Sequence, residues 1–371
     1  MKIIFLCGSL EPGKDGVGDY TRRLAGELNR QGHSCAIVAI MDKAVKETVG
    51  EQQNTEYNIP VLRLPFSKGY TLNCLEAKSW LDSFNPDWIS LQYVPFSFHP
   101  KGLPFGLSIA LQQLTKGRKL HLMIHELWVG MNRESSLKLK ILGKLQHLML
   151  QSFIKNCSTN LIHTQTKLYQ FQLKQMGYRS QFLPLFSNVR LAAPIVKLSR
   201  KNEMKFAFFG GIHHDAPVKE FIEALKSYSK SLDGVLLKFV FIGNCGNSIL
   251  EWTSVLDAES ISYEIYGFCS DKQITNIFST CHYAVATTPF ILLQKSGSVA
   301  AYLQHQLPII CVARKWEVKN FYKSAIIDLK NITKFENEKK VIEILNQNFD
   351  CSVEKSLQFV ANKFLKGLIK H

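Results

Sequence analysis

The chain alternates short apolar runs with longer stretches whose apolar residues recur at helical spacing. The first run, Lys2 to Cys7, breaks into a glycine-rich loop, and Tyr20 to Asn29 then reads as an amphipathic helix. A second apolar run, Ser34 to Ile40, follows a short turn at Gly32. This order predicts a βαβ unit with two parallel strands and a right-handed connection.

The same alternation continues along the chain with one interruption. Between Ser187 and Glu203 the pattern lapses into a polar segment with a proline, which predicts a linker. Because strands and helices alternate on both sides of it, we expect an α/β protein with two doubly wound halves and ligands at the carboxyl ends of the strands. The remaining strands are expected at 61–64, 87–92, 120–124, 160–163, 178–185, 205–209, 237–243, 262–267, 283–286 and 308–312, with helices at 73–85, 135–155 and 218–231.

These patterns divide the chain of 371 residues into three parts. Residues 1–190 are predicted to form the first domain and residues 191–353 the second. The basic tail at 354–371 has a helical pattern and is expected to pack back toward the first domain.

The net charge of the protein indicates what kind of partner it binds. Lysine and arginine total 45 against 30 acidic residues, a formal net charge of +15 that is spread along the chain, so an anionic partner is expected. No recognition helix, zinc pattern or basic aromatic motif indicates nucleic acid. A phosphorylated small molecule and an anionic membrane surface both remain as candidates.

Cysteine usage and hydropathy indicate the compartment. The nine cysteines are scattered and form no C-x-x-C pair, which predicts buried free thiols in a reducing environment. No secretory segment and no run of about 20 apolar residues is present, so we expect a cytoplasmic protein whose membrane contact, if any, is peripheral at the inner face.

A polar loop late in the chain has the features of a phosphate site. Residues 294–298, Gln-Lys-Ser-Gly-Ser, open a short predicted helix. Ser296 or Ser298 can cap this helix, Gly297 lets a ligand approach the backbone, and Lys295 adds a positive charge to the helix dipole. The alternative is an ordinary capped helix. The glycines of the first loop do not fall at G-x-G-x-x-G spacing, which argues against a nicotinamide dinucleotide site.

Two segments carry a resemblance to a known family. FLCGSLEPGKDGVGDYTRRLAGELNRQGH at 5–33 and AYLQHQLPII at 301–310, with the two predicted halves, resemble the GT-B fold of nucleotide-sugar glycosyltransferases, and most nearly the retaining family 4. The resemblance covers nearly the whole chain. It implies two Rossmann-like domains facing each other across a cleft, with the acceptor on the first domain and the donor on the second.

The sequence departs from that family at two donor-site motifs. The acidic pair of the family would fall at Leu293 and Ala301, and its Arg and Lys at Gly211 and Ala216. Lys295 to Ser298 looks like the variant in which a basic residue precedes Ser-Gly-Ser. The donor-binding residues that the resemblance implies are Gly210, Gly211, His213, Lys219, Gly243, Phe268, Lys295, Ser296, Gly297 and Ser298.

The first domain supplies the catalytic and acceptor candidates. His125 follows a predicted strand directly and resembles the family's histidine near the transferred sugar; the alternative is a loop-capping histidine bonded to backbone. Gly16, Gly18, Asp19 and Glu126 are the implied acceptor-binding residues. Asp19 is equally expected to act as a plain N-cap, and Phe268 of the second domain either stacks on the base or belongs to the core.

The resemblance implies retaining transfer of a sugar from a nucleoside diphosphate sugar to a glycan or lipid-linked acceptor, in cell-surface polysaccharide or glycolipid synthesis. No metal or other cofactor is expected, because no Asp-x-Asp or histidine cluster suits a divalent ion. The competing hypotheses are a non-catalytic nucleotide- or glycan-binding protein on a degenerate scaffold, and an epimerase- or phosphorylase-like enzyme of the same architecture.

Overall fold

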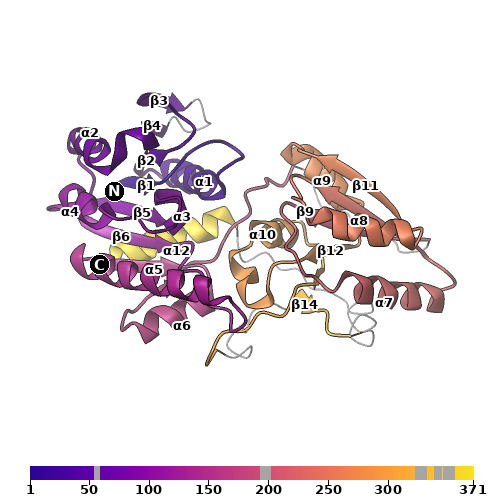
Figure 1. Ribbon diagram of the computed structural model, residues 1–371. Helices are drawn as coiled ribbons and strands as arrows, with labels where there is room; N and C mark the ends of the chain where they lie inside the picture. Colours follow the sequence, from indigo (N-terminus) through magenta and orange to yellow (C-terminus); the bar gives the residue numbers. More distant parts are fainter. Residues whose placement is uncertain (54–58, 193–201, 322–331, 338–344, 346–355) are drawn as a thin grey trace. The chain divides into compact units, whose positions relative to one another are not determined.

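The computed structural model describes residues 1–53, 59–192, 202–321, 332–337, 345 and 356–371 (Figure 1). The chain divides into two compact units. Unit 1 comprises Met1–Pro184, Glu317–Phe321 and Leu357–His371, and unit 2 comprises Leu185–Trp316 with the described residues of Tyr322–Ser356.

Unit 1 is built on a sheet of order β3-β4-β2-β1-β5-β6-β7-β8. Its neighbouring strands pair in parallel, except that β3 and β4 are antiparallel. The strands are β1 (Lys2–Cys7), β2 (Ser34–Asp42), β3 (Val49–Gln53), β4 (Ile59–Pro65), β5 (Trp88–Tyr93), β6 (Lys119–Ile124), β7 (Leu161–Thr164) and β8 (Gln181–Phe182). The helices are α1 (Gly16–Arg30), η1 (Phe66–Lys68), α2 (Gly69–Phe84), α3 (Pro95–Phe98), α4 (Leu107–Thr115), α5 (Leu137–Asn156), α6 (Lys167–Gln175) and α12 (Leu357–Ile369).

Helices cover both faces of this sheet, which is why β1, β5 and β6 are buried almost throughout. On one face, α12 places the ring of Phe364 5.9 Å from that of Phe5 and 5.0 Å from that of His121. On the other face, Phe153 of α5 stacks on Tyr93 at 6.0 Å. Alternate residues of a strand point to opposite faces, so the polar side chains of β5 lie on the α12 side.

Unit 2 has a parallel sheet of order β11-β10-β9-β12-β13-β14. Its core is rich in aromatic rings, such as Phe206 on Phe239 at 5.1 Å and Phe208 on Phe241 at 4.8 Å. The strands are β9 (Glu203–Phe209), β10 (Leu236–Ile242), β11 (Ser262–Gly267), β12 (Tyr283–Ala286), β13 (Ile309–Cys311) and β14 (Ile332–Lys334); the helices are α7 (Val218–Ser231), α8 (Ile249–Ala258), α9 (Asp271–Ser279), η2 (Phe290–Lys295) and α10 (Gly297–Gln304).

The predicted α/β class with two parallel sheets is confirmed, and some local predictions are wrong. The strand expected at 178–185 is only β8, two residues long. The polar strand β3 was not predicted, because it carries no apolar run and pairs at the sheet edge. The eight described cysteines carry free thiols. None of the helices among the described residues is long and apolar enough to cross a membrane.

Candidate functional site

The glycine-rich loop after β1 is closed by the start of α1. Asp15 is the N-cap of this helix, and its Oδ1 accepts hydrogen bonds from the amides of Val17 and Gly18, both at 2.9 Å. The alternative role of Asp19 as N-cap is therefore wrong, because the helix starts four residues earlier than the apolar pattern indicates. A Cβ on Gly18 would lie 2.9 Å from the Ser9 carbonyl oxygen, so this position needs glycine, whereas nothing lies within 4 Å of a Cβ on Gly16.

Asp19 holds the loop from inside the first turn of α1. Its carboxylate accepts from the amide of Gly13 at 3.2 Å and pairs with Arg22 at 3.4 Å. Burial raises the pKa of Asp19 above its usual value. These contacts stabilise the loop in which the resemblance places the acceptor.

A buried carboxylate that the sequence analysis missed anchors the same loop. Asp42, at the end of β2, accepts from Ser9 Oγ at 2.9 Å, from the Leu10 amide at 3.1 Å and from Arg63 Nε at 2.8 Å. Arg63 also pairs with Glu11 at 2.8 Å. Burial opposes ionisation, yet these hydrogen bonds hold the pKa of Asp42 below its usual value. The one available signal was an acidic residue at the end of an otherwise apolar strand.

His125 lies at the carboxyl end of β6, as predicted, and is buried. Its amide donates to the carbonyl oxygen of Tyr93 at 3.1 Å, which fixes the backbone against β5. The ring packs edge-on against Tyr20, with centroids 4.9 Å apart. Its Nε2 lies 2.9 Å from Gln92 Oε1 and its Nδ1 lies 3.4 Å from Gln165 Oε1.

The partners of Gln92 determine the tautomer of His125. Gln92 donates through Nε2 to Ser90 Oγ at 2.8 Å, so its Oε1 faces His125 and accepts from the imidazole Nε2. When the His125 ring is neutral and Nε2 carries the hydrogen, Nδ1 acts as a hydrogen-bond acceptor. The buried Nε2 of Gln165 has no hydrogen-bond partner among the described residues, and rotating this amide by 180° would let it donate to Nδ1. The side-chain amides thus fix the orientation of the His125 ring, and with Gln165 rotated they suit its neutral form.

Behind His125, a row of hydrogen-bonded polar side chains continues along the α12 face of the sheet. Ser90 Oγ lies 2.8 Å from His121 Nδ1, and His121 Nε2 lies 2.9 Å from His163 Nδ1. Both histidines are fully buried. Burial and the neighbouring histidine hold the pKa of His121 well below its usual value, while burial and the nearby Lys363 lower the pKa of His163 to about 4. Both rings are therefore neutral near pH 7.

The buried, neutral histidines of this row predict that the protein loses stability on acidification. A neutral His163 has a folded-state pKa of about 4, below the ordinary 6.5, so its contribution is complete above pH 6.5 and is lost as the pH falls toward 4. The expected loss in unfolding free energy is up to about 3 kcal/mol. Urea denaturation from pH 7 to pH 4 measures it, and His163→Gln should show a flatter dependence. Equal slopes for the two proteins would contradict this explanation.

The loop that carries His125 and Glu126 is fastened to α5. A Cβ on Gly143 would overlap the carbonyl oxygen of Val129, and Gln146 Oε1 accepts from the Val129 amide at 2.9 Å. Gly130 has φ +75 and touches the first turn of the same helix. Glu126 is half-buried beside His125, and its amide points to Tyr93, at 3.4 Å from the carbonyl oxygen.

We predict that Gly143→Ala lowers the unfolding free energy by about 3 kcal/mol, because the methyl group meets backbone that cannot rotate away. A matched change is Gly16→Ala, whose Cβ meets nothing within 4 Å and which should be neutral or slightly stabilising. Thermal and urea denaturation compare the two. Similar stabilities for both variants would show that the loop does not pack on α5 in this way.

In unit 2, glycines bring the carboxyl ends of two central strands together. Gly210 follows β9 and Gly243 follows β10, both with positive φ, and a Cβ on Gly243 would lie 3.6 Å from the Gly210 nitrogen. The Gly210 amide donates to Ile242 O at 2.9 Å. Ser298 Oγ donates to Phe209 O at 2.5 Å, which joins the first turn of α10 to the end of β9.

The start of α10 offers backbone donors. Ser296 is the cap, since its Oγ accepts from the Val299 amide at 3.4 Å. The amides of Gly297 and Ser298 lie in the first turn, where a helix provides no internal acceptor. Gly297 is exposed and no described atom lies within 4 Å of where its Cβ would be. An anion can therefore approach these amides along the helix dipole.

Basic side chains follow the strands of unit 2 and precede this helix. The pKa of His213 is lowered, first by burial and then by the charges of Arg314, Lys295 and His214. Arg314 also lies 3.2 Å from His214 Nε2 and 3.5 Å from Asp215. Sequence analysis predicted Lys295 and His213 and missed Arg314, whose signal was its place just after the strand at 308–312. We call the cations Lys295 and Arg314, together with the histidines His213 and His214, the cation cluster.

The other predicted donor-binding residues are Phe268 and Gly211, which follow strands, and Lys219, which lies on a helix. Phe268 is 88% exposed and follows Gly267, whose carbonyl oxygen accepts from the Gly243 amide at 2.5 Å, so the alternative of a core role is wrong. Gly211 is exposed next to Gly210. Lys219 is exposed on α7, and no contact between described residues joins it to the cation cluster.

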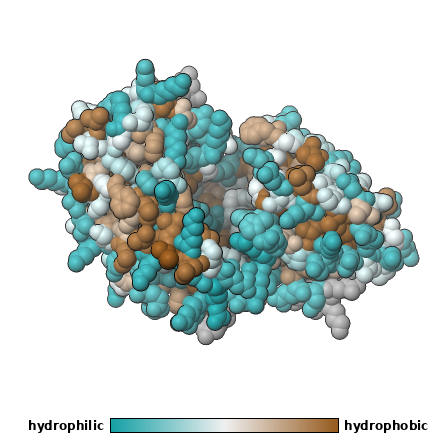
Figure 2. All heavy atoms as spheres, in the orientation of Figure 1, coloured by the Kyte–Doolittle hydropathy of each residue, from teal (hydrophilic) through white to brown (hydrophobic). Residues whose placement is uncertain are grey.

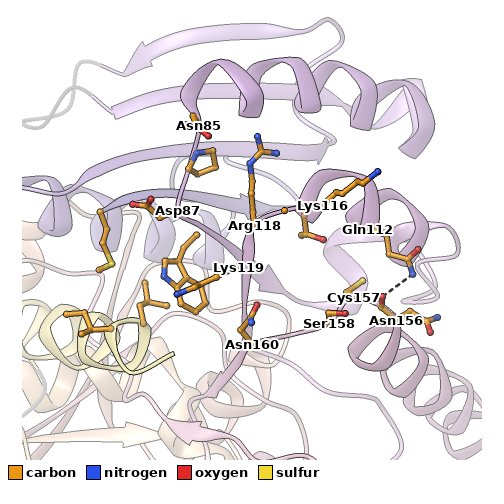
Figure 3. A pocket seen from close by; sticks show the side chains of 17 residues that line it. Asn85, Asp87, Gln112, Lys116, Arg118, Lys119, Asn156, Cys157, Ser158 and Asn160 are labelled. Carbon is orange, nitrogen blue, oxygen red and sulfur yellow. Dashed lines mark hydrogen bonds between the residues drawn. The ribbon is translucent and has the colours of Figure 1, made fainter.

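The cavity of unit 1 shown in Figure 3 lies at the opposite edge of its sheet. This pocket of about 1060 Å³ includes Asp87, Lys119 and Asn160 at the amino ends of β5, β6 and β7. Gln112 closes one side with a hydrogen bond to the Asn156 carbonyl oxygen at 3.2 Å. Because His125 follows the carboxyl end of β6, this pocket is distinct from the candidate site. In the described part of the chain, no group of His, Cys, Asp and Glu is arranged to hold a metal ion.

Comparison with known proteins places this geometry in a fold family. No protein-family model and no curated protein sequence matches the chain. Among solved structures, the apo form of the lipopolysaccharide outer core galactosyltransferase WaaB is 12% identical, with 100% of this chain and 99% of that chain covered and a TM-score of 0.62.

Two other solved structures show the range of the fold. One, described as trehalose-6-phosphate from E. coli bound with UDP-2-fluoro glucose, is 10% identical over 100% of this chain and 99% of its own, with a TM-score of 0.57. A putative UDP-N-acetylglucosamine 2-epimerase from Listeria monocytogenes is 12% identical over 100% and 96%, also at 0.57. The chain has the GT-B fold, as its sequence predicts, and these identities establish the fold alone.

Proposed function

We propose that this protein is a glycosyltransferase that moves a sugar from a nucleoside diphosphate sugar to an acceptor hydroxyl with retention of configuration. One observation carries the proposal. In unit 2, Lys295 directly precedes the cap of α10, whose first turn is open at Gly297, and the charges of Lys295 and Arg314 both act on His213 after the carboxyl end of β9. This combination of fixed charge and backbone donors suits a diphosphate.

The chemistry follows from where charge develops. Breaking the bond between the anomeric carbon and the diphosphate places negative charge on the leaving oxygen. The amides of Gly297 and Ser298, with Lys295 and Arg314, supply donors and positive charge for that oxygen, and they are fixed before reaction begins. The exposed ring of Phe268, near Gly243, supplies a face on which the nucleotide base stacks.

Unit 1 supplies the acceptor half of the proposal. His125 is held in a fixed orientation by Gln92 and orients the transferred sugar through a hydroxyl group. The loop anchored by Asp19 and Asp42, together with Glu126, contacts the acceptor. Retention follows when the acceptor hydroxyl attacks from the side of the departing phosphate and gives up its proton to it. The acceptor is a glycan or a lipid-linked glycan, and the role is in cell-surface polysaccharide or glycolipid synthesis.

A thermal-shift panel tests the donor half directly. The purified chain is heated with uridine, guanosine, adenosine, cytidine and thymidine diphosphates and their sugar derivatives, with and without EDTA. We expect one nucleotide series to raise the melting temperature, equally in both conditions, because Lys295 and Arg314 neutralise the diphosphate. No shift with any member would refute the donor site, and a shift that EDTA abolishes would refute metal independence.

A further inference from the structure

The long helix α5 of unit 1 exposes an apolar stripe to solvent. Leu137, Ile141, Leu145 and Leu148 are 73%, 55%, 47% and 50% exposed. At 3.6 residues per turn, these four side chains fall within about 80° of one another around the helix. They therefore form one continuous surface, which we call the α5 stripe.

Packing within unit 1 does not need this stripe. The buried side of α5 is formed by Gly143, Gln146, Leu150 and Phe153, which lie on the opposite side of the helix. These residues contact the loop at Val129 and the ring of Tyr93. The packing of α5 on the sheet therefore does not require leucine and isoleucine at the exposed positions. Large exposed apolar patches usually mark binding surfaces.

The exposed apolar surface continues onto neighbouring helices. Helix α4 contacts both α5 and α2, so the three helices lie side by side on one face of the sheet. Ile109 of α4, the preceding Phe105, and Leu72 and Leu75 of α2 are each more than half exposed. Figure 2 shows apolar side chains gathered over the part of unit 1 where Figure 1 places α5, with further ones toward α4 and α2.

Positive charge borders the stripe. Helix α5 contains four lysines and no acidic residue. Lys138 lies on one side of the stripe, and Lys140 and Lys144 lie on the other. All three are exposed, and none of them forms an ion pair with a described residue. The surface thus combines apolar side chains with uncompensated positive charge.

We propose that the α5 stripe and its lysines dock unit 1 on an anionic lipid bilayer, with α5 lying in the plane of the interface. Leucine and isoleucine side chains enter the boundary between headgroups and acyl chains, while the lysines reach lipid phosphates. A second copy of this chain fits less well. A two-fold contact through α5 would bring two sets of lysines together without acidic partners.

This inference does not depend on the reaction proposed above, because it concerns where the protein lies and not what it transfers. If both hold, the docked face brings the acceptor loop of unit 1 near lipid-linked glycans. Failure of bilayer binding would leave the donor site of unit 2 untouched, and loss of donor binding would leave the docking surface untouched. The two proposals are therefore separable.

Vesicle sedimentation tests the docking surface. The full chain is mixed with vesicles of phosphatidylcholine containing one third phosphatidylglycerol, or of phosphatidylcholine alone. We expect binding to the anionic vesicles that weakens with salt, and at least tenfold weaker binding to the neutral ones. The double variant Ile141→Asp/Leu145→Asp should lose binding at least tenfold. The double variant Lys138→Gln/Lys144→Gln should lose it by about 25-fold, at about fivefold per lysine.

Matched variants of unit 2 show whether a loss of vesicle binding is specific to the α5 stripe and its lysines. Leu250→Asp changes an equally exposed leucine of α8, and Lys230→Gln/Lys272→Gln removes the same charge; both should bind vesicles within twofold of the original protein. Circular dichroism confirms that all variants fold. Equal losses from the unit 2 variants, no binding to anionic vesicles, or dimerisation in solution that the Ile141→Asp/Leu145→Asp change abolishes would each overturn the proposal.

Discussion

Replacing His125 by alanine lowers the rate of sugar transfer by about a hundredfold and leaves the affinity for the nucleoside diphosphate unchanged. The imidazole lies at the carboxyl end of β6 and is held by Gln92 and Tyr20. A group that only orients the sugar affects the reacting geometry, and a small misplacement costs about two orders of magnitude in rate. Turnover of the matching nucleotide sugar and calorimetric binding of its diphosphate measure the two quantities.

Two other variants show whether the effect belongs to His125. Gln92→Leu removes the acceptor that fixes the tautomer, and we expect a smaller loss, of about tenfold, together with a shifted pH dependence of the rate. His33→Ala removes a histidine of unit 1 that bonds the chain's amino terminus at 3.1 Å and should leave turnover intact. A rate for His125→Ala within threefold of the original would contradict the assigned role.

Replacing Lys295 by alanine weakens binding of the nucleoside diphosphate by about tenfold to a hundredfold, the value of one charge-assisted hydrogen bond to phosphate. Arg314→Ala should have a similar effect, because its charge, like that of Lys295, acts on His213. Calorimetric titration at two salt concentrations gives the dissociation constants.

Lys219→Ala is the matched control, since it removes one positive charge from the same unit at an exposed position on α7. We expect its affinity to change less than twofold. This result would also remove Lys219 from the donor-binding residues that the resemblance implies. If Lys219→Ala and Lys295→Ala weakened binding equally, the effect would reflect net charge and not a site at α10.

The parts of the site that follow from local sequence were predictable. Lys295, Ser296 and Gly297 lie next to one another, and a basic residue before a cap and a glycine indicates a helix start without knowledge of the fold. His125 was predictable because a polar residue directly after a buried strand falls at the carboxyl edge of a parallel sheet. Both inferences need only the order of elements along the chain.

The parts of the site that depend on segments distant in the sequence were not predictable. Asp42 and Arg63 belong to different strands, and only the pairing of β2 with β4 brings them to the loop at Ser9. Arg314 follows a strand with no motif around it, so its nearness to His213 depends on how β9 and β13 flank β12. The start of α1 was misplaced because two of its first three residues, Gly16 and Gly18, are glycines, which have a low helix propensity.

Turnover of a nucleotide sugar by water tests the central claim most directly, because it needs no knowledge of the acceptor. The protein is incubated with the sugar derivative of the nucleotide that raises its melting temperature, and the products are followed by proton NMR. We predict slow, equal release of the nucleoside diphosphate and the free sugar, with the anomeric configuration retained in the sugar first released, and little release by His125→Ala. A bound nucleotide sugar that stays intact would identify a binding protein, and a nucleotide sugar that changes configuration while still attached would identify an epimerase; either result would contradict sugar transfer.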